Sequence, residues 1–168
     1  MARPYSYAFG RSNHQLEYYT IGNLLNNRVC EQEEESKNII NEKINQHMFI
    51  SHHEGIRKTF TEFNNDVNRL TNALHQQLSL KRGDVIGVWS CNTYNWVVVQ
   101  YAAAKLGAIL CTINPYYQAQ ELNYVLRKAD IKCLFMPGTG SLQQQINRFE
   151  SIFNDALKIE NDTRVSFV

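Results

Sequence analysis

The sequence has no excess of either charge, since 17 lysines and arginines against 16 aspartates and glutamates give a formal net charge of +1. A chain with this balance lacks the basic surface that binds nucleic acid, so we expect no nucleic-acid partner. Long apolar runs are also missing. The longest one, residues 96–113, is interrupted by Gln100, Lys105 and Gly107. It predicts a helix end followed by a strand, so we expect no transmembrane segment.

Closely spaced cysteines are missing too, although the sequence contains 4 cysteines. No two of them have the short spacing of a metal site or of a redox motif. Two fall inside predicted strands, where a reduced thiol behaves as a small hydrophobic side chain. We therefore interpret the cysteines as buried structural thiols, which agrees with a reducing compartment. They are Cys30, Cys91, Cys111 and Cys133.

The signatures of common nucleotide-binding and hydrolase sites are absent as well. Residues 138–141 are small and lie between a predicted strand and a predicted helix, where a phosphate could bind. They match neither G-x-x-x-x-G-K-[ST] nor G-x-G-x-x-G, so we interpret them as a connector. Ser90 and Ser141 lack the G-x-S-x-G setting of a hydrolase nucleophile. Tyr116 and Tyr117 could contact a ligand, but we favour packing against a neighbouring segment outside this chain.

What the sequence does contain is a set of three short apolar runs. They begin at Val85, Ala108 and Ile131, at equal intervals, and each interval holds an amphipathic segment. The interval leaves room for a strand, a crossover helix and two tight loops, which parallel strands require. We therefore predict a parallel βαβαβ block. Its strands are expected at 85–89, 108–113 and 131–136 and its helices at 94–106 and 118–128, followed by a helix at 143–157 and a strand at 164–168.

A β-hairpin and a helix are predicted ahead of this block. Two extended runs, 48–53 and 56–60, flank Glu54 and Gly55. A connection of two residues needs a positive φ, which glycine adopts without strain. Thr59 and Glu62 then have the spacing of a capping box. The helix is expected to continue to about residue 80 with one apolar face, made of Phe63, Val67, Leu70, Leu74 and Leu78.

The first 47 residues have a different composition. We predict an extended arm, a short helix at 19–29, and a solvated helix or surface insertion at 31–47, because a run of glutamates is typical of an exposed face. The arm has the arginine content of an organelle presequence, but its proline, glycine and aromatic residues favour an extended segment. The predicted division of the chain is therefore 1–47 and 48–168.

Four further polar residues have structural interpretations. Asp84 and Asp130 precede predicted parallel strands. Ligands bind at the opposite, carboxyl ends of such strands, so these two carboxylates are not candidates for catalysis. His52 and His53 are adjacent but have no third metal ligand nearby in the sequence. We predict that the two histidines mark the end of a strand that enters a turn.

Short motifs along the chain resemble the amino-terminal region of the AMP-forming acyl-CoA synthetases. The similarity lies in their order and spacing and covers most of residues 5–135. The matching segments are 5–7, 20–22, 53–60, 82–84, 92–96, 106–108 and 114–116, together with Glu121 and Leu122. The resemblance implies an α/β fold in which the hairpin, its helix and the βαβαβ block form an incomplete half of the large adenylate-forming domain. Segment 31–47 is longer than the corresponding link in relatives.

For a full-length relative, the resemblance implies that ATP and magnesium activate a medium-chain fatty acid, that pyrophosphate leaves, and that the acyl group passes to coenzyme A. The family's phosphate loop ending in Pro-Lys, its aromatic-Gly-x-Thr-Glu motif, its ribose-binding aspartate and its carboxyl-terminal lysine all lie downstream of the matched region. None of them occurs in these 168 residues. We therefore assign no catalytic, cofactor-binding or metal-binding residue, and expect this chain alone to be inactive and to bind no cofactor.

Three hypotheses remain open at this point. The chain could be the amino-terminal part of a fatty acid CoA ligase, a small flavodoxin-like binding module, or a non-catalytic partner that docks its half-sheet on another chain. The resemblance implies the mitochondrial matrix, or the cytoplasm if no presequence exists. Because the three strands are too apolar for a water-facing surface, we also expect the isolated chain to self-associate.

Overall fold

A parallel sheet lies at the centre of the protein. The structure is a computed structural model that describes residues 19–38, 47–138, 143–159 and 166–167. The strands of the sheet are β3 (Val85–Trp89), β4 (Ile109–Ile113), β5 (Ile131–Phe135) and β6 (Ser166–Phe167). Their order is β4-β3-β5-β6, and all neighbours are parallel. The predicted parallel βαβαβ block is therefore confirmed, and β3 has the predicted bounds.

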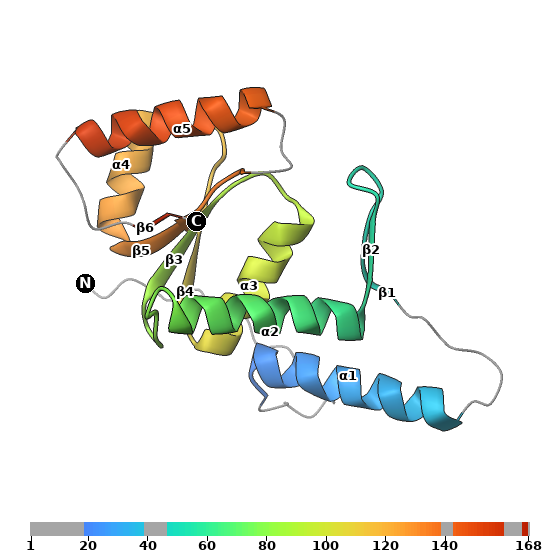
Figure 1. Ribbon diagram of the computed structural model, residues 1–168. Coiled ribbons are helices and arrows are strands. Elements are labelled where there is room, and N and C mark those ends of the chain that lie inside the picture. Colours follow the sequence, from blue (N-terminus) through green and yellow to red (C-terminus); the bar gives the residue numbers. More distant parts are fainter. Residues whose placement is uncertain (1–18, 39–46, 139–142, 160–165, 168) are drawn as a thin grey trace, which may run out of the picture.

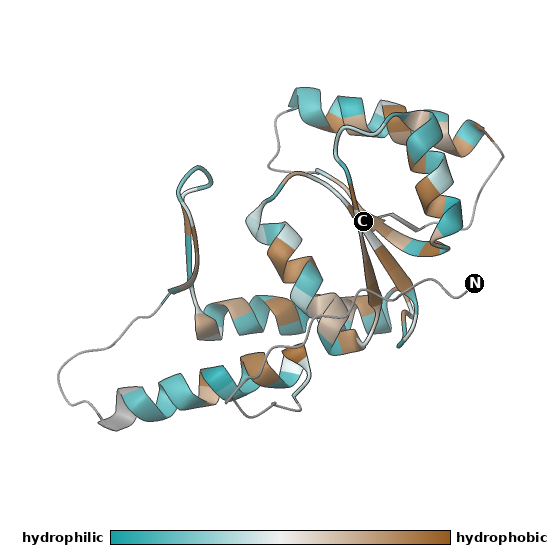
Figure 2. Cartoon of the chain, turned by 180° about the vertical axis from the view of Figure 1, so that it is seen from behind, coloured by the Kyte–Doolittle hydropathy of each residue, from teal (hydrophilic) through white to brown (hydrophobic). Residues whose placement is uncertain are grey.

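Helices cover both faces of this sheet (Figure 1). On one side lie α1 (Ile21–Asn38), α2 (Phe60–Gln76) and α3 (Tyr94–Leu106), and on the other lie α4 (Ala119–Lys128) and α5 (Gln143–Lys158). Each side has its own hydrophobic cluster. Side chains alternate along a strand, so Ile86 and Val88 of β3 enter the first cluster and Trp89 enters the second. Figure 2 shows the strands as largely hydrophobic between helices that carry many hydrophilic residues.

Local signals explain the bounds of α3. Thr93 is the N-cap, and its Oγ1 accepts a hydrogen bond from the amide of Trp96 at 3.2 Å. Gly107 ends the helix in the left-handed region with φ of 74°. The helix therefore begins and ends at the predicted residues. In the same way, Thr59 and Glu62 form the predicted capping box at the start of α2.

The last residue of β3 contacts two segments on the other side of the sheet. Trp89 is fully buried, and its ring lies 4.4 Å from that of Phe149 of α5, measured between centroids. Its Nε1 donates a hydrogen bond of 3.0 Å to the carbonyl oxygen of Asn114, in the loop after β4. Because a buried indole N–H needs an acceptor, the hydrogen bond holds this loop against the end of β3. The ring contact with Phe149 holds α5 there as well.

The hairpin forms as predicted, but its connection differs. It consists of β1 (His47–Ser51) and β2 (Ile56–Thr59), paired antiparallel. The connection is 52–55, four residues long instead of two, and Gly55 donates its amide to the carbonyl of His52 at 3.3 Å. Gly55 has the predicted positive φ, at 66°. The longer loop arises because the pairing of the strands stops at Ser51 and Ile56.

Helix α1 corrects the prediction for the amino-terminal region. It continues without a break through the glutamate run to Asn38, whereas the sequence indicated a short helix at 19–29 and, separately, a solvated helix or surface insertion at 31–47. Leu25 and Val29 are buried against the rest of the protein, and Arg28 pairs with Glu31 one turn later at 2.9 Å. The predicted arm and residues 39–46 lie outside the described residues. The division of the chain at residue 47 stays a prediction.

The prediction that all cysteines are buried is wrong for two of them. Cys30 on α1 and Cys91 after β3 are exposed free thiols. Cys133 in β5 is buried, and this burial raises the pKa of its thiol to about 11. Cys111 in the edge strand β4 is partly buried, and burial raises its pKa as well. The strand cysteines therefore behave as small hydrophobic residues, as predicted.

Candidate functional site

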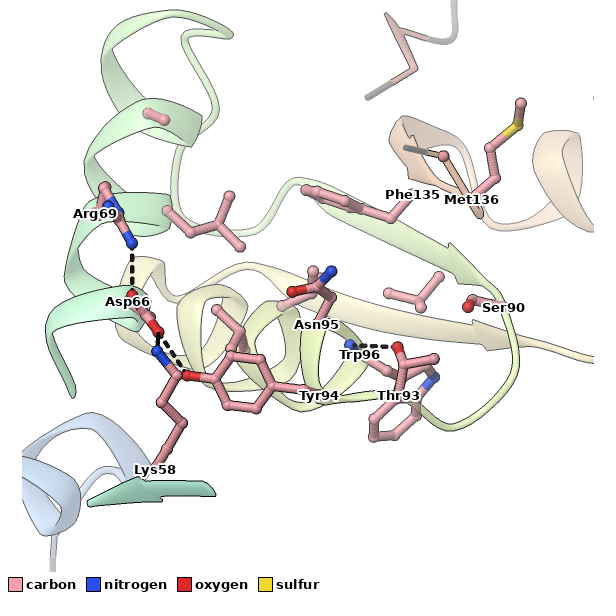
Figure 3. A pocket seen from close by; sticks show the side chains of 16 residues that line it. Lys58, Asp66, Arg69, Ser90, Thr93, Tyr94, Asn95, Trp96, Phe135 and Met136 are labelled. Carbon is pink, nitrogen blue, oxygen red and sulfur yellow. Dashed lines mark hydrogen bonds and ion pairs between the residues drawn. The ribbon is translucent and has the colours of Figure 1, made fainter. Parts of the chain in front are cut away.

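A cavity of about 550 Å³ opens where the strand order of the sheet reverses. The chain leaves β3 toward β4 on one side and then crosses to β5 on the other, so the carboxyl ends of β3 and β5 flank a topological switch point. Parallel α/β sheets bind ligands at this position. The cavity is bounded by β2, α2, the ends of β3 and β5, and α3 (Figure 3). We refer to it as the switch-point cavity.

The floor of this cavity is apolar. It is formed by side chains of α2, β3, α3 and β5 that also belong to the first hydrophobic cluster. These residues are Leu70, Val88, Trp96, Val98, Val99 and Phe135. A concave apolar surface with a few polar groups at its edge is the usual form of a site for a small molecule.

Asp66 is the centre of the polar rim. Its Oδ2 lies 3.0 Å from Nζ of Lys58 and accepts a hydrogen bond of 2.6 Å from the hydroxyl of Tyr94. Its other oxygen pairs with the guanidinium of Arg69 (Figure 3). Burial acts to raise the pKa of Asp66, but the hydrogen bonds from Tyr94 and Lys58 outweigh burial and hold the pKa below its usual value. Burial, and then the hydrogen bond to Asp66, raise the pKa of Tyr94.

The amino terminus of α3 also lies at the cavity, but a carboxylate of the same chain already occupies it. The amide of Tyr94, the first residue of α3, donates to Oε2 of Glu54 at 3.0 Å and to Oε1 at 3.3 Å. Glu54 comes from the hairpin loop. A helix amino terminus attracts anions because its free N–H groups point outward and its dipole is positive there. In this structure Glu54 provides that negative charge.

The cavity does not suit a magnesium ion. Asp66 is the single carboxylate among its lining residues, and two cationic side chains already pair with it, whereas Mg²⁺ needs oxygen ligands in an octahedral arrangement. Across the described ranges, no group of three or more His, Cys, Asp or Glu residues is arranged to hold a metal. His52 and His53 lie in the hairpin turn, because β1 ends at Ser51 and not at the predicted residue 53, and Oγ of Ser51 lies 3.1 Å from Nδ1 of His53.

The other candidates from the sequence are dispersed. Ser90 lines the switch-point cavity and donates to the carbonyl of Cys91 at 3.0 Å, whereas Ser141 and most of the 138–141 connector lie outside the described residues. Asp84 accepts the amide of Lys81 at 2.8 Å, at the amino end of β3 and away from the cavity.

The three remaining candidates, one carboxylate and two tyrosines, also lie away from the switch-point cavity. Asp130 pairs with Lys132 at 2.9 Å next to the start of β5. Tyr116 is 74% exposed, and the guanidinium of Arg148 lies 5.8 Å from its ring centroid. Tyr117 packs against the second hydrophobic cluster. Packing of the two tyrosines against a segment outside this chain stays a prediction.

The residues that build the rim were missed from the sequence. Lys58, Asp66 and Tyr94 belong to β2, α2 and α3, and Tyr94 is 28 positions from Asp66. No local spacing rule connects positions so far apart. Glu54 was interpreted only as a turn residue. Its charge was the one feature of the sequence that could have suggested a partner far away in the chain, here the amide of Tyr94.

Comparison with known proteins agrees with this architecture. Residues 36–166 match the model of the AMP-binding enzyme family. The chain therefore belongs to the AMP-binding enzymes, and its fold matches the amino-terminal part of the large domain in adenylate-forming proteins. No described helix is long and apolar enough to cross a membrane.

The curated relatives that this chain resembles in sequence are acyl-CoA ligases. The chain is 33% identical over 159 residues to the mitochondrial medium-chain acyl-CoA ligase ACSF2 of Bos taurus. This alignment covers 93% of this chain and 23% of the bovine protein. The chain is 37% identical over 132 residues to ACSF2 of Danio rerio, covering 79% of this chain and 20% of that protein. The chain thus spans less than a quarter of the length of these relatives.

Solved structures share the fold. The amino-terminal domain of FACL13 from Mycobacterium tuberculosis superimposes with a TM-score of 0.66 at 22% identity, covering 89% of this chain and 33% of that one. The anthranilate CoA ligase AuaEII, in complex with anthranoyl-AMP, has a TM-score of 0.59 at 24% identity, covering 83% of this chain and 23% of that one. At these identities the likeness establishes the fold alone.

Proposed function

We propose that this chain forms the amino-terminal part of an AMP-forming fatty acid CoA ligase. The whole protein would convert ATP, a medium-chain fatty acid and coenzyme A to acyl-CoA, AMP and pyrophosphate. The observation that carries the proposal is the 33% identity to a medium-chain acyl-CoA ligase across 93% of this chain. ATP, magnesium and coenzyme A are the cofactor and substrates of this reaction in the whole protein.

The role of this region in the reaction is structural. Adenylation is catalysed by positioning and by groups that stabilise developing charge. Asp66, Lys58 and Arg69 neutralise one another at the rim of the switch-point cavity, so they are not available for that task. The region instead builds one wall of the large domain, with the loops after β3, β4 and β5 facing the remainder of the ligase. The chain by itself is expected to be inactive.

A pyrophosphate-release assay tests the inactivity. The chain of 168 residues is mixed with ATP, Mg²⁺, octanoate and coenzyme A, with human ACSF2 as the positive control. We expect no pyrophosphate above background from this chain. Turnover that scales with the concentration of this chain and survives repurification would contradict the proposal that the catalytic groups lie elsewhere.

A chimera tests the family function directly. The 159-residue region of bovine ACSF2 that aligns with this chain is replaced by the residues of this chain. We expect the chimera to form acyl-CoA from a medium-chain acid. The same chimera with Ile86→Asp is the negative control, because Ile86 is fully buried in β3 and a charge there is not tolerated. A soluble, folded chimera without ligase activity would count against the proposal.

One structural observation favours a second candidate, a small flavodoxin-like binding module. The strand order β4-β3-β5-β6 is that of flavodoxin-like sheets, and the switch-point cavity lies where such proteins bind their ligand. Size-exclusion chromatography with light scattering separates the two candidates. A monodisperse monomer with a cooperative melt would favour the module, whereas self-association favours a region that needs the rest of a ligase.

The mitochondrial matrix is the proposed location. The support is that the ACSF2 relatives are mitochondrial proteins. Expression with a carboxyl-terminal fluorescent tag, followed by fractionation and protease protection, tests this location. A signal that stays in the cytosolic fraction would overturn it and would favour the cytoplasmic alternative.

A further inference from the structure

The hairpin is attached to the rest of the described protein in an unusual way. Thr59 is both the last residue of β2 and the N-cap of α2, and Phe60 already belongs to the helix. No loop separates the two elements, so Thr59 is the point at which β2 joins α2. Figure 1 shows the hairpin as a narrow arm that rises from the start of α2 beside α3. A two-stranded hairpin is marginally stable on its own, so contacts with its surroundings must hold it.

Met48, Phe49 and Ile56 of the hairpin pack against the first hydrophobic cluster, and further contacts of the hairpin meet at one residue of α3. The ring of Phe49 of β1 lies 5.2 Å from the ring of Tyr94, and Nζ of Lys58 of β2 lies 5.5 Å from the same ring. The loop contributes the third contact, in which the Glu54 carboxylate accepts the Tyr94 amide. The hairpin therefore holds Tyr94 by its ring and by its backbone. Position 54 and position 94 are 40 residues apart, so this contact is wholly tertiary.

Glu54 supplies a negative charge at the amino terminus of α3, where the first turn of the helix itself has none. That turn contains no acidic residue, and the side chain of its N-cap Thr93 accepts the amide of Trp96, which leaves the amide of Tyr94 to another acceptor. Glu54 adds the negative charge that the helix dipole favours and accepts a further free N–H. Its side chain is only 21% exposed, so solvent screens the interaction incompletely.

We propose that the hairpin is a hinged latch on the switch-point cavity, with Thr59 as its hinge and Glu54 as the catch that closes on the amino terminus of α3. Closure brings Lys58 to the cavity, where its ammonium pairs with Asp66 and forms part of the rim. Release removes this wall and opens the cavity along the hairpin side. The latch follows from contacts within this chain and does not depend on the proposed ligase reaction.

Hydrogen exchange read by mass spectrometry tests the latch on the full chain. The variants are Glu54→Ala and the milder Glu54→Gln, which keeps an acceptor but loses the charge. Glu150→Ala, at an exposed position of α5, is the matched control. We expect peptides from β1 and β2 to exchange at least tenfold faster in Glu54→Ala and several-fold faster in Glu54→Gln. Peptides from β3 and α5, and the circular dichroism spectrum, should be unchanged.

A second readout reports on the cavity itself. Trp96 lines the cavity, whereas Trp89 is fully buried on the other side of the sheet. Acrylamide should therefore quench Trp96 selectively, and quenching should increase at least twofold in the Glu54 variants. Tyr94→Phe keeps the ring and the amide that the hairpin contacts, so its hairpin peptides should stay protected.

The alternative to a latch is a simple helix cap. If only peptides covering the start of α3 exchange faster, while the hairpin and the quenching of Trp96 are unchanged, Glu54 caps α3 and the latch is refuted. Exchange identical to that of the unmodified chain also refutes it. If Glu54→Ala does not fold, Glu54→Gln decides, because the acceptor that it keeps preserves the geometry.

Discussion

The hydroxyl of Tyr94 donates a hydrogen bond of 2.6 Å to Oδ2 of Asp66 and joins α3 to α2 at the rim of the switch-point cavity. A hydrogen bond to a charged acceptor contributes more to stability than a neutral one. We expect Tyr94→Phe to lower the free energy of unfolding by about 1.5 to 3 kcal/mol in urea. Tyr124→Phe, at a residue that is 65% exposed, is the control and should change little. Equal midpoints for the two variants would show that the hydrogen bond contributes nothing.

The same carboxylate makes stability depend on pH. The pKa of Asp66 in the folded protein lies below its unfolded value of 3.8, so the folded state favours the ionised form. This contribution is fully present above pH 3.8 and is lost as the pH falls through the lower folded value. Asp66→Asn should therefore be less stable than the unmodified chain at neutral pH. Its melting temperature, measured from neutral to acidic pH, should also fall less steeply as the pH is lowered. A fall as steep as that of the unmodified chain would contradict this.

Gly55 tests the backbone of the hairpin loop. Its φ is 66°, and a Cβ at this position would meet nothing within 4 Å. Any cost of a side chain is therefore backbone strain and not a clash. We expect Gly55→Val to destabilise the protein by about 1 to 2 kcal/mol. Gly138→Val is matched, because its Cβ would also lie in open space but its φ is not positive, and it should leave the denaturation midpoint unchanged. An unchanged midpoint for Gly55→Val as well would refute the strain.

Lys105 holds three helices together. Its Nζ donates to amide oxygens of Asn26 on α1 and of Asn64 and Asn68 on α2, at 2.8, 2.6 and 2.7 Å. Burial lowers the pKa of Lys105. Lys105→Met keeps most of the stem but leaves the amide oxygens without this donor, and should cost about 1 to 3 kcal/mol. Lys158→Met, at a side chain that is 75% exposed, is the control. Faster hydrogen exchange in α1 for Lys105→Met alone would show that the lysine holds this helix.

The edge strand β4 is the expected site of self-association. Ile109 is 56% exposed and Thr112 is exposed, and β4 pairs with β3 on one side only within the described sheet. Such an edge can pair with another chain. We expect the isolated chain to elute as oligomers and to bind a hydrophobic dye strongly. Ile109→Lys with Thr112→Lys should shift it toward the monomer, because lysine on an edge strand discourages pairing. A monodisperse unmodified chain would contradict this prediction.

The parts of the fold that follow from the sequence are those with local causes. Thr93 and Gly107 fix the ends of α3 through short-range capping, and the apolar run 85–89 marks β3 by itself. The sequence divided helix α1 into two segments because its glutamates carry no apolar periodicity, whereas the structure has one helix whose first half is anchored by Leu25 and Val29. Cys30 is next to Val29 in sequence but not on the buried face. Sequence position alone could not separate the two.

The candidate site could not be derived in the same way. Its rim depends on side chains from three elements that meet only after the sheet and helices have packed. The contact between Glu54 and Tyr94 depends in addition on a loop of four residues, whereas the sequence favoured two. A loop of two residues would have placed the Glu54 carboxylate at a different position relative to the amide of Tyr94.

The position of β3 has a consequence for synthesis on the ribosome. β3 is synthesised before β4 and β5, yet it lies between them in the sheet. The edge of β3 that pairs with β5 therefore stays unpaired until β5 has been synthesised. The ribosome adds 46 residues between Trp89 and Phe135 (135 − 89), which takes roughly 2 to 9 s at the usual rate of elongation. During this interval the apolar residues Val85, Ile86 and Val88 lack their partner strand. We therefore expect chaperones to bind the nascent chain for seconds, until β5 pairs with β3.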